Sequence, residues 1–313
     1  MSKKKNILII RLGALGDVVL NSGWIFAIRE KYPDARIAFM TTKPFVPFIK
    51  SIPFIDEVIV DSRPRYNIKE WWKTCKKEIA DRKWDYIFDL QSSKRTRKKY
   101  FNFARFFAKY NMRWVYLKKG HFTLMQVEKK RHFSLGKLTK KTFDLIPKNI
   151  DLSFVKGDEK NFYLLPEKTF LLIIPGCSAS HPYKRWPVEK YLQLVLKAEE
   201  KGISSVVLGT NAEKQEIDTI CQRSNAVNFQ NKASLLDIPA LAAKAAVVIG
   251  NDTGPVHMSC FSKTPAVVLF SERTATSAND LPNVTNLIGK DIADIFVEQV
   301  WNEVEKNMGK KNA

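Results

Sequence analysis

Residues 6–17, NILIIRLGALGD, are the stretch of sequence that decides the fold. The first five residues form an apolar run with the length of a short buried strand. Two glycines, Gly13 and Gly16, follow in a turn, and apolar residues then recur at helical spacing as far as Tyr32. A buried strand, a glycine-containing turn and a helix in this order are typical of the start of an α/β domain with a parallel sheet.

The same alternation of short apolar runs and helical stretches continues along the chain and restarts after residues 156–161. Further strands are predicted at 37–40, 58–60, 86–90, 114–117, 170–174, 205–208, 247–249 and 266–270. In the second half, helices are predicted at 187–200, 235–245 and 255–261. We therefore predict two α/β domains, residues 1–155 and 156–313, and leave open whether the C-terminal helix packs back on the first. The strands of both domains would end at a central cleft, where open α/β sheets bind ligands.

Positive charge is concentrated in the first half of the chain. The 313 residues carry a net charge of +20. Residues 1–150 hold 34 basic and 13 acidic side chains, whereas residues 151–313 hold 18 and 19. The first half is therefore expected to meet a polyanion, with nucleic acid, an anionic membrane surface and a phosphorylated glycolipid as candidates. The composition, 45% hydrophobic and 27% charged, argues against wholesale disorder.

The cysteines and the apolar segments indicate a cytoplasmic protein. Cys75, Cys177, Cys221 and Cys260 show neither a C-x-x-C pair nor zinc-ligand spacing, so they are expected to be reduced thiols. The start of the chain superficially resembles a secretory signal, but Arg11 interrupts the apolar run and no small-residue cleavage site follows. Nowhere do about 18 uncharged apolar residues run together, so a membrane-spanning helix is not expected.

Asp17, at the end of the opening segment, is the first candidate for chemistry. Gly13 and Gly16 would let a substrate approach the backbone closely. The segment fits neither the G-x-G-x-x-G pattern nor the P-loop, which requires a lysine, so dinucleotide binding and NTP hydrolysis are disfavoured. The alternative for Asp17 is structural: it would only cap the free N–H groups at the start of the helix.

A second candidate site follows the predicted strand 170–174. Ser178 and Ser180 offer hydroxyl groups, and Lys184 adds positive charge just before a helix. Such a loop suits a phosphate group, with the lysine as a point charge and the hydroxyls as hydrogen-bond donors. The alternative is a solvated basic turn that Trp186 anchors in the core.

A third candidate site, GNDTGPVH at residues 250–257, again lies between a buried strand and a helix. The amides of Thr253 and Gly254 would point toward an anion, whereas Asp252 could accept hydrogen bonds from a sugar hydroxyl or a base amine. His257 is open to three interpretations: a catalytic acid, a donor to a phosphate, or a packed residue of the first turn. No second histidine or carboxylate stands at metal-ligand spacing nearby, so no metal site is expected.

A basic and aromatic segment follows the predicted strand 86–90. Lys94, Arg95 and Arg97 belong to a run of cations at 94–99, and five aromatic residues fall within 100–107. Because positions 100, 103 and 107 share one helical face, the rings are interpreted either as a core stripe or as a surface that touches acyl chains while the cations grip phosphate headgroups. Stacking of nucleic-acid bases on the rings is a further alternative.

Taken together, these segments resemble glycosyltransferase family 9, the bacterial heptosyltransferases that add ADP-activated heptose to the inner core of lipopolysaccharide. The resemblance covers nearly the whole chain and rests on IIRLGALGD at 9–17, on the segment from PG at 175–176 to KRWP at 184–187, and on GNDTGP at 250–255 with His257. It implies an α/β fold of the GT-B class, with two Rossmann-like parallel-sheet domains. The first would mainly bind the acceptor and the second the nucleotide sugar.

The resemblance also implies roles for single residues. Asp17 would be the catalytic base. The implied acceptor-binding residues are Gly13, Gly16, Lys94, Arg95 and Arg97. The implied donor-binding residues are Ser178, Ser180, Lys184, Glu213, Asp252, Thr253, Gly254 and His257. The chain departs from the family pattern at 260–263 and 271–274, beside the donor pocket, and this leaves the transferred sugar open.

The activity that the resemblance implies is an inverting transfer of heptose from ADP-heptose to Kdo-lipid A or to a heptosylated core, without a metal ion or another cofactor. Asp17 would take the proton of the attacking hydroxyl, and Lys184 would neutralise the leaving diphosphate. The expected partners are the nucleotide sugar, an anionic glycolipid and the inner leaflet of the cytoplasmic membrane, bound peripherally, and not nucleic acid. The alternatives are a family member that uses another nucleotide sugar, a basic nucleic-acid-binding protein and a non-catalytic glycolipid-binding protein.

Overall fold

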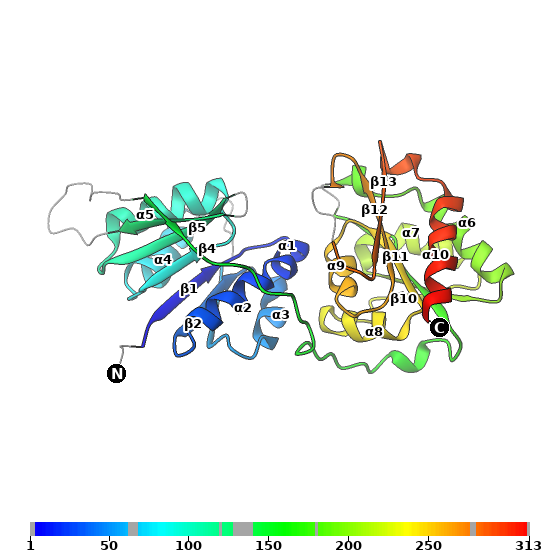
Figure 1. Cartoon of the computed structure of the whole chain (residues 1–313), viewed down its shortest axis with the longest axis horizontal. Coiled ribbons are helices and arrows are strands. Elements are labelled where there is room, and N and C mark those ends of the chain that lie inside the picture. The colour runs from blue at the N-terminus through cyan, green and yellow to red at the C-terminus, as the bar shows by residue number, and fades with distance from the viewer. Residues whose placement is uncertain are drawn as a thin grey trace. The chain divides into compact units, whose positions relative to one another are not determined.

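The computed structural model describes residues 4–61, 68–118, 121–127, 140–178, 181–275 and 280–311 (Figure 1). The chain divides into two compact units, residues 1–150 and 151–313. Each unit has its own sheet, and helices accompany both sheets.

The sheet of the first unit has the strand order β3-β2-β1-β4-β5-β6-β7. Its strands are β1 (Asn6–Ile10), β2 (Arg36–Thr41), β3 (Glu57–Val60), β4 (Tyr86–Asp89), β5 (Met112–Lys118), β6 (His121–Val127) and β7 (Lys140–Phe143). The strands from β3 to β5 run parallel, whereas β6 and β7 are antiparallel to their neighbours. β1 lies inside the sheet because residues 7–10 are fully buried on both faces.

Helices cover both faces of this sheet. They are α1 (Leu15–Leu20), α2 (Ser22–Lys31), α3 (Val46–Ser51), α4 (Ile68–Cys75) and α5 (Phe101–Phe107), with a short 3-10 turn η1 (Lys43–Phe45) and π-helical segments η2 (Lys76–Ala80) after α4 and η3 (Arg95–Tyr100) before α5. Leu8 and Ile10 of β1 belong to one core cluster with Ile79 of η2 and Phe103 of α5. On the other side of the sheet, Phe88 of β4 contacts Tyr32 at the end of α2.

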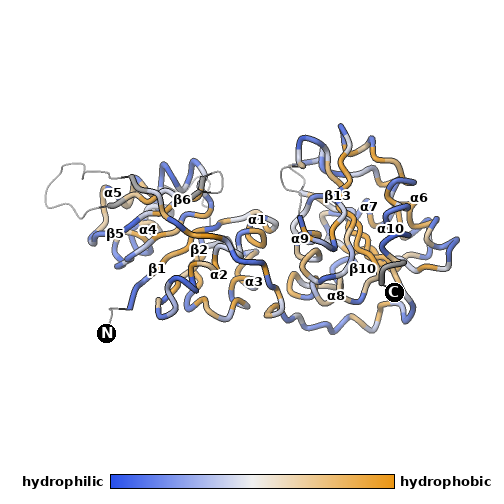
Figure 2. The backbone as a smooth tube through the Cα atoms, in the orientation of Figure 1, coloured by the Kyte–Doolittle hydropathy of each residue, from blue (hydrophilic) through white to orange (hydrophobic). Residues whose placement is uncertain are grey.

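The described residues of the second unit form a parallel sheet with the strand order β10-β9-β8-β11-β12-β13. The strands are β8 (Phe170–Ile174), β9 (Ser204–Gly209), β10 (Val227–Gln230), β11 (Val247–Asn251), β12 (Ala266–Ser271) and β13 (Val284–Gly289). The first strand of the unit lies in the middle and the chain winds outward from it in both directions, which is the strand order of dinucleotide-binding domains. Figure 2 shows hydrophobic stretches along the central strands.

The helices of the second unit are α6 (Val188–Glu200), α7 (Lys214–Cys221), α8 (Ile238–Lys244), α9 (Gly254–Cys260) and α10 (Val297–Lys311). α6 begins directly after Pro187, a residue that suits a helix start. Val300, Trp301 and Val304 of α10 are buried in the core of this unit, where α10 contacts α6, β11 and β12.

The structure confirms the predicted α/β fold and contains each predicted strand. The sheet of the first unit also has an antiparallel edge formed by β6 and β7, which the sequence analysis did not predict. Only two residues separate β5 from β6, and a parallel neighbour would need a crossover of about a dozen residues or more. The core-stripe interpretation of the aromatic segment holds for Tyr100 and Phe103, which are buried, but Phe107 remains about half exposed.

Candidate functional site

Each sheet has one point at which the chain changes its direction of winding, between β1 and β4 in the first unit and between β8 and β11 in the second. Open α/β sheets bind ligands at such points, beyond the carboxyl ends of the strands. Residues 11–17 with 89–97 are called the first loop cluster below. Residues 175–185, 209–213 and 250–257 are called the second loop cluster. The sequence positions of all predicted site residues fall within these two clusters.

Asp17 lies in the first turn of α1 with its side chain 54% exposed. Its Oδ2 accepts a hydrogen bond from the Ala14 N–H at 3.2 Å and lies 2.8 Å from a terminal nitrogen of Arg11. Arg11 is itself buried and donates to the Leu90 carbonyl at 2.6 Å, so its guanidinium is fixed between β1 and the loop after β4. Asp17 thus caps the turn, as the structural alternative requires, and at the same time presents an oriented and solvent-accessible carboxylate.

Gly13 is required for a steric reason that the sequence alone does not show. Its φ is +131°, a conformation that residues with side chains disfavour, and a Cβ at this position would lie 2.6 Å from Cε2 of Phe45. Gly16 lies within the first turn of α1. Close approach of a substrate to these two glycines stays a prediction, because the ring of Phe45 already accounts for Gly13.

The three predicted acceptor-binding cations have different environments. Arg95 donates to the Tyr100 hydroxyl at 3.0 Å and lies 3.4 Å from the buried Asp61. Tyr100 in turn donates to Asp61 at 2.5 Å, so Arg95 is part of a network at the carboxyl end of β3. Lys94 and Arg97 are exposed. The accessible positive charge of the first loop cluster therefore comes mainly from Lys94 and Arg97.

Asp89, the last residue of β4, is a buried carboxyl group of the first loop cluster that the sequence analysis did not single out. Burial raises its pKa to about 6, and the Ser92 N–H, which donates to Oδ1 at 2.9 Å, opposes this shift. Asp89 pairs in register with Ile10, where the Asp17 loop begins. A carboxylate at the end of a central strand is the signal that could have revealed it.

Lys184, Asp252 and His257 form the centre of the second loop cluster. Lys184 forms an ion pair with Oδ2 of Asp252, and Nε2 of His257 lies 2.8 Å from Oδ1. Burial would raise the pKa of Asp252, but the hydrogen bonds from His257 and Lys184 and the lysine charge hold this pKa below its ordinary value. The structure therefore brings together three predicted residues from the loops after β8 and β11.

Thr253 and Gly254 lie next to this cluster at the start of α9. Thr253 is the N-cap residue, but its hydroxyl makes no capping hydrogen bond. Its Oγ1 is buried and has no hydrogen-bond partner among the described residues. A buried hydroxyl without a partner costs about 1–3 kcal/mol, so this is a position that a polar ligand group would complete.

Asn251 connects the loops of the second loop cluster, and the sequence analysis did not assign it a role. It is fully buried. Its Oδ1 accepts from the Trp186 N–H at 3.1 Å and from the Tyr191 hydroxyl at 2.9 Å. Its Nδ2 donates to the carbonyls of Pro175 and Gly176 at 2.7 and 3.3 Å. These four hydrogen bonds use the whole capacity of the amide group, and a polar residue at the end of a buried strand is the signal that could have revealed it.

Glu213 lies at the side of the second loop cluster that follows β9. Its carboxylate accepts from the N–H and the hydroxyl of Thr210 at 2.9 and 2.7 Å. Its Cγ lies 2.4 Å from the place that a Cβ would take on Gly176, so the glycine allows the two loops to meet. Ser178 is exposed on the same loop as Gly176, whereas Ser180 lies outside the described residues.

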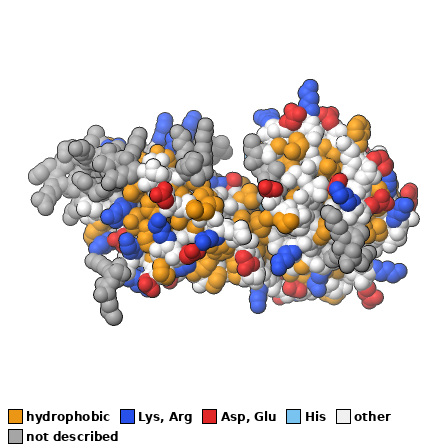
Figure 3. Space-filling view, viewed as in Figure 1, with side chains coloured by type: hydrophobic (Ala, Val, Ile, Leu, Met, Phe, Trp, Pro, Cys, Tyr) orange, Lys and Arg blue, Asp and Glu red, His pale blue; other side chains and the backbone are white. Residues whose placement is uncertain are grey.

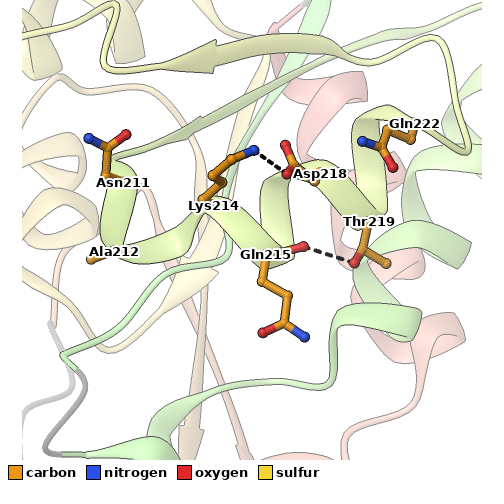
Figure 4. A pocket seen from close by; sticks show the side chains of 7 residues that line it. All are labelled: Asn211, Ala212, Lys214, Gln215, Asp218, Thr219 and Gln222. Carbon is orange, nitrogen blue, oxygen red and sulfur yellow. Dashed lines mark hydrogen bonds and ion pairs between the residues drawn. The ribbon is translucent and has the colours of Figure 1, made fainter.

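A shallow pocket of about 500 Å³ lies beside this cluster, along η6 (Asn211–Glu213) and α7 (Figure 4). It is lined by Asn211, Ala212, Lys214, Gln215, Asp218, Thr219 and Gln222. Within it, Lys214 pairs with Asp218, and the Thr219 hydroxyl donates to the Gln215 carbonyl one turn earlier. None of the predicted site residues lines this pocket, so we do not assign the chemistry to it.

Across the described ranges, no group of three or more His, Cys, Asp and Glu side chains is placed to hold a metal ion. In the same part of the chain, no helix combines the length and the apolar character needed to cross a bilayer. The face shown in Figure 3 carries acidic and basic side chains on both units, and hydrophobic side chains lie among them.

Comparison with known proteins places the chain in a family. The model of glycosyltransferase family 9 (heptosyltransferase) matches residues 110–307. The lipopolysaccharide core heptosyltransferase OpsX of Haemophilus influenzae is 23% identical over 305 residues, which cover 91% of this chain and 84% of that protein.

Solved structures share the fold over nearly the whole chain. A glycosyl transferase of family 9 from Veillonella parvula gives a TM-score of 0.72 at 17% identity, with 98% of this chain and 97% of that chain covered. The ADP-heptose lps heptosyltransferase II of E. coli gives 0.71 at 18% identity, with 98% and 100% covered. The family model matches more than half of this chain. The chain therefore belongs to glycosyltransferase family 9, the heptosyltransferases, and is a glycosyltransferase with the two-domain α/β fold of the GT-B class.

Proposed function

We propose that this enzyme transfers a heptose from ADP-heptose to the inner core of lipopolysaccharide, at Kdo-lipid A or at a core that already carries heptose. The observation that carries the proposal is the cluster of Lys184, Asp252 and His257 beside the Thr253 hydroxyl, at the switch point of the second sheet. The choice of donor and acceptor is supported by the E. coli neighbour, an ADP-heptose transferase, and by the H. influenzae relative, a lipopolysaccharide core heptosyltransferase.

In this proposal the second loop cluster binds the nucleotide sugar. Lys184 supplies a cation for the diphosphate, and the Thr253 hydroxyl has hydrogen-bonding capacity to spare. Asp252 accepts hydrogen bonds from sugar hydroxyls, while His257 and Lys184 hold its carboxylate in place. Glu213, beside Gly176, contacts the nucleoside. The hydroxyls of Ser178 and Ser180 are proposed to donate hydrogen bonds to the diphosphate.

The first loop cluster supplies the base. An acceptor hydroxyl attacks the anomeric carbon of the heptose from the face opposite the diphosphate. The new C–O bond forms as the bond from carbon to diphosphate oxygen breaks, which inverts the configuration, and ADP leaves. Asp17 takes the hydroxyl proton. The contacts of Asp17 with Arg11 and Ala14 all involve Oδ2, so Oδ1 has no partner among the described residues and is the atom proposed to accept the proton.

The charge that develops on ADP is neutralised by Lys184 in this proposal, with no metal ion or other cofactor. The basic first half of the chain meets the phosphates and carboxylates of the acceptor, mainly through Lys94 and Arg97. Since that acceptor is anchored in a bilayer by its lipid, we place the enzyme in the cytoplasm, peripherally bound to the inner leaflet of the cytoplasmic membrane. Nucleic acid is not a partner in this proposal.

The transfer reaction tests these roles directly. The purified chain is incubated with ADP-heptose and Kdo-lipid A, and ADP release and product mass are followed with and without EDTA. Asp17→Asn, which keeps the shape of the side chain, is expected to lower kcat by about 10²- to 10⁴-fold and to leave ADP-heptose affinity nearly unchanged. Lys184→Ala is expected to raise the donor KM and lower kcat, whereas Lys201→Ala, an exposed lysine of the same unit, is expected to do neither. Full activity of Asp17→Asn would remove Asp17 from the mechanism.

The identity of the donor has its own test. Thermal unfolding is recorded with ADP-, UDP-, GDP- and CDP-sugars, because a ligand that binds only the folded chain raises its Tm. ADP-heptose is expected to give the largest shift. A larger shift with a sugar on another nucleotide would replace ADP-heptose in the proposal and would connect the departure at residues 271–274 with a changed donor.

A further inference from the structure

Aromatic side chains are exposed on the helices α4 and α5 of the first unit. Trp72 is 37% exposed, Phe106 51% and Phe107 48%. The ring centroids of Trp72 and Phe107 are 5.1 Å apart, and those of Phe106 and Phe107 are 6.4 Å apart, so the three rings form one continuous aromatic ridge. Phe103 is buried beneath them and contacts both Trp72 and Phe107, at 5.0 and 4.8 Å. The aromatic ridge is therefore held in place by the core.

Positive charge accompanies the aromatic ridge. Residues 94–110 contain seven Lys and Arg and no Asp or Glu. The Nζ of Lys76 lies 5.9 Å from the ring centroid of Trp72. The exposed lysines on α4, η2 and η3 include Lys69, Lys73, Lys76, Lys98 and Lys99. Exposed rings set among cations in this way are typical of proteins that bind at the interface of an anionic bilayer, where rings enter the headgroup region and lysines meet lipid phosphates.

We infer that the aromatic ridge is a docking surface for an anionic phospholipid bilayer. The arrangement of the rings favours a bilayer over nucleic acid. Trp72 stands at 61° to Phe107 and at 84° to Phe103, so edges and faces of these rings pack against each other. Stacked bases need open ring faces, whereas insertion among lipid headgroups needs a compact apolar projection.

The inference rests on the proposed function in one respect: a lipid-anchored acceptor brings the enzyme to a bilayer. The same helical segment links the two surfaces, since η3 begins beside Lys94 in the first loop cluster and α5 ends at Phe107. At about 1.5 Å per residue, 95–107 spans roughly 20 Å. Docking through the aromatic ridge would thus hold the cations of the first loop cluster within about that distance of the headgroups.

Vesicle binding by the full chain tests the inference without any nucleotide sugar. Co-sedimentation is measured with vesicles of equal parts phosphatidylethanolamine and phosphatidylglycerol, and with vesicles of phosphatidylcholine alone. The chain is expected to bind the anionic vesicles, and Phe106→Ser/Phe107→Ser is expected to weaken binding at least about tenfold. The matched control is Phe296→Ser, which removes a ring that is 67% exposed in the second unit and is expected to leave binding unchanged. Circular dichroism and Tm confirm that each variant is folded.

The contribution of charge is tested with the double variant Lys98→Glu/Lys99→Glu. Its control is Lys201→Glu/Lys232→Glu, which replaces two exposed lysines of the second unit and changes the net charge by the same amount. The first pair is expected to weaken binding by about tenfold or more at low salt, since each lysine near an anionic surface contributes about 1 kcal/mol. Equal effects of the two pairs would mean that only net charge matters and would overturn the assignment to this surface.

Three results would refute the docking surface: no preference for anionic vesicles, unchanged binding of the Phe106→Ser/Phe107→Ser variant, or a loss of single-stranded nucleic-acid binding in this variant with vesicle binding intact. Transfer to a detergent-dispersed acceptor is measured in parallel. Transfer without vesicle binding would refute the docking surface alone, whereas vesicle binding that depends on the aromatic ridge, without transfer, would refute the proposed function alone.

Discussion

Replacing Asn251 by alanine is expected to loosen the second loop cluster more than any change at its surface. The variant removes the group that accepts from the Trp186 N–H and the Tyr191 hydroxyl and donates to the Pro175 and Gly176 carbonyls. The loops before and after the site would lose their common attachment. Donor binding is therefore expected to weaken as well, although Asn251 itself is fully buried.

The magnitude follows from the partners left behind. The Trp186 N–H, the Tyr191 hydroxyl and the Pro175 carbonyl would lose a hydrogen bond in a buried region, at about 1–3 kcal/mol for each group. Water entering the vacated space would recover part of this cost, so we expect a loss of about 3–5 kcal/mol. The total stability of a domain is about 5–15 kcal/mol, and the second unit is therefore expected to open locally and to unfold at clearly lower urea.

The assay must report on the two units separately, because a chain with two units need not unfold in a single step. Hydrogen exchange followed by mass spectrometry in increasing urea gives an unfolding free energy for peptides from each unit. Peptides that contain the Trp186 amide are expected to lose protection first. The control is Tyr191→Phe, which removes one hydrogen bond and leaves Trp186 paired with Asn251, and it is expected to cost about 0.5–1.5 kcal/mol.

Two results would refute this reasoning. One is a loss below about 1 kcal/mol in the second unit of Asn251→Ala, which would mean that water satisfies the stranded groups. The other is strict additivity of Asn251→Ala and Tyr191→Phe, because residues that share a hydrogen bond should show a coupling of about 0.5 kcal/mol or more.

Three further predictions concern single groups. Burial raises the pKa of Asp89 from 3.8 to about 6, so the folded state binds the proton of this carboxyl group more tightly than the unfolded state does. The stability gained from this tighter proton binding is complete below about pH 4 and is lost as the pH rises through 6. At pH 8, Asp89→Asn is therefore expected to have a free energy of unfolding in urea that is higher than that of the parent chain by up to about 3 kcal/mol. This difference is expected to shrink toward about pH 4, and a difference that does not vary with pH would contradict the reasoning. Gly13→Ala is expected to lower the free energy of unfolding, measured in urea, by about 1–3 kcal/mol. Adding Phe45→Ala is expected to restore only part of this loss, because residue 13 keeps its positive φ. Lys184→Ala is expected to reduce the affinity for ADP measured by calorimetry, and the double variant Lys184→Ala/Asp252→Asn is expected to recover part of it. No recovery in the double variant would show that Asp252 does not repel the diphosphate.

The sequence predicted the fold because both units begin with apolar strands, 6–10 and 170–174, that need helices on both faces. It missed β6 and β7, because the apolar residues of β6 are interrupted by Thr123 and Gln126, and β7 begins with two lysines. Asn251 and Asp89 were missed for another reason. Each is a single polar residue at a strand end, and its role depends on partners such as Trp186 and Ser92 that only the folded chain brings near.

The exposed rings show the limit of periodicity. Helical spacing placed positions 100, 103 and 107 on one face, and two of these side chains are buried. The segment begins as the π-helical η3 and continues as α5, so its residues do not keep one constant angular step. Phe107 is also the last residue of α5, where it contacts Trp72 and Phe106 and stays half exposed. Periodicity therefore left both alternatives open, and the structure assigns Tyr100 and Phe103 to the core and Phe106 and Phe107 to the aromatic ridge.

The pairing of Lys184 with Asp252 sets a condition on how a diphosphate can bind. A buried carboxylate next to a phosphate group is repelled by it unless cations or hydrogen-bond donors lie between them. The lysine ammonium has three N–H donors, so it can keep Asp252 and still reach phosphate oxygens. Nε2 of His257 lies 2.8 Å from Oδ1 of Asp252. This contact keeps a hydrogen bond on the second carboxylate oxygen when the lysine also contacts a phosphate oxygen. In the proposed function, the same carboxylate orients both the lysine and a sugar hydroxyl, while His257 is buried beside it.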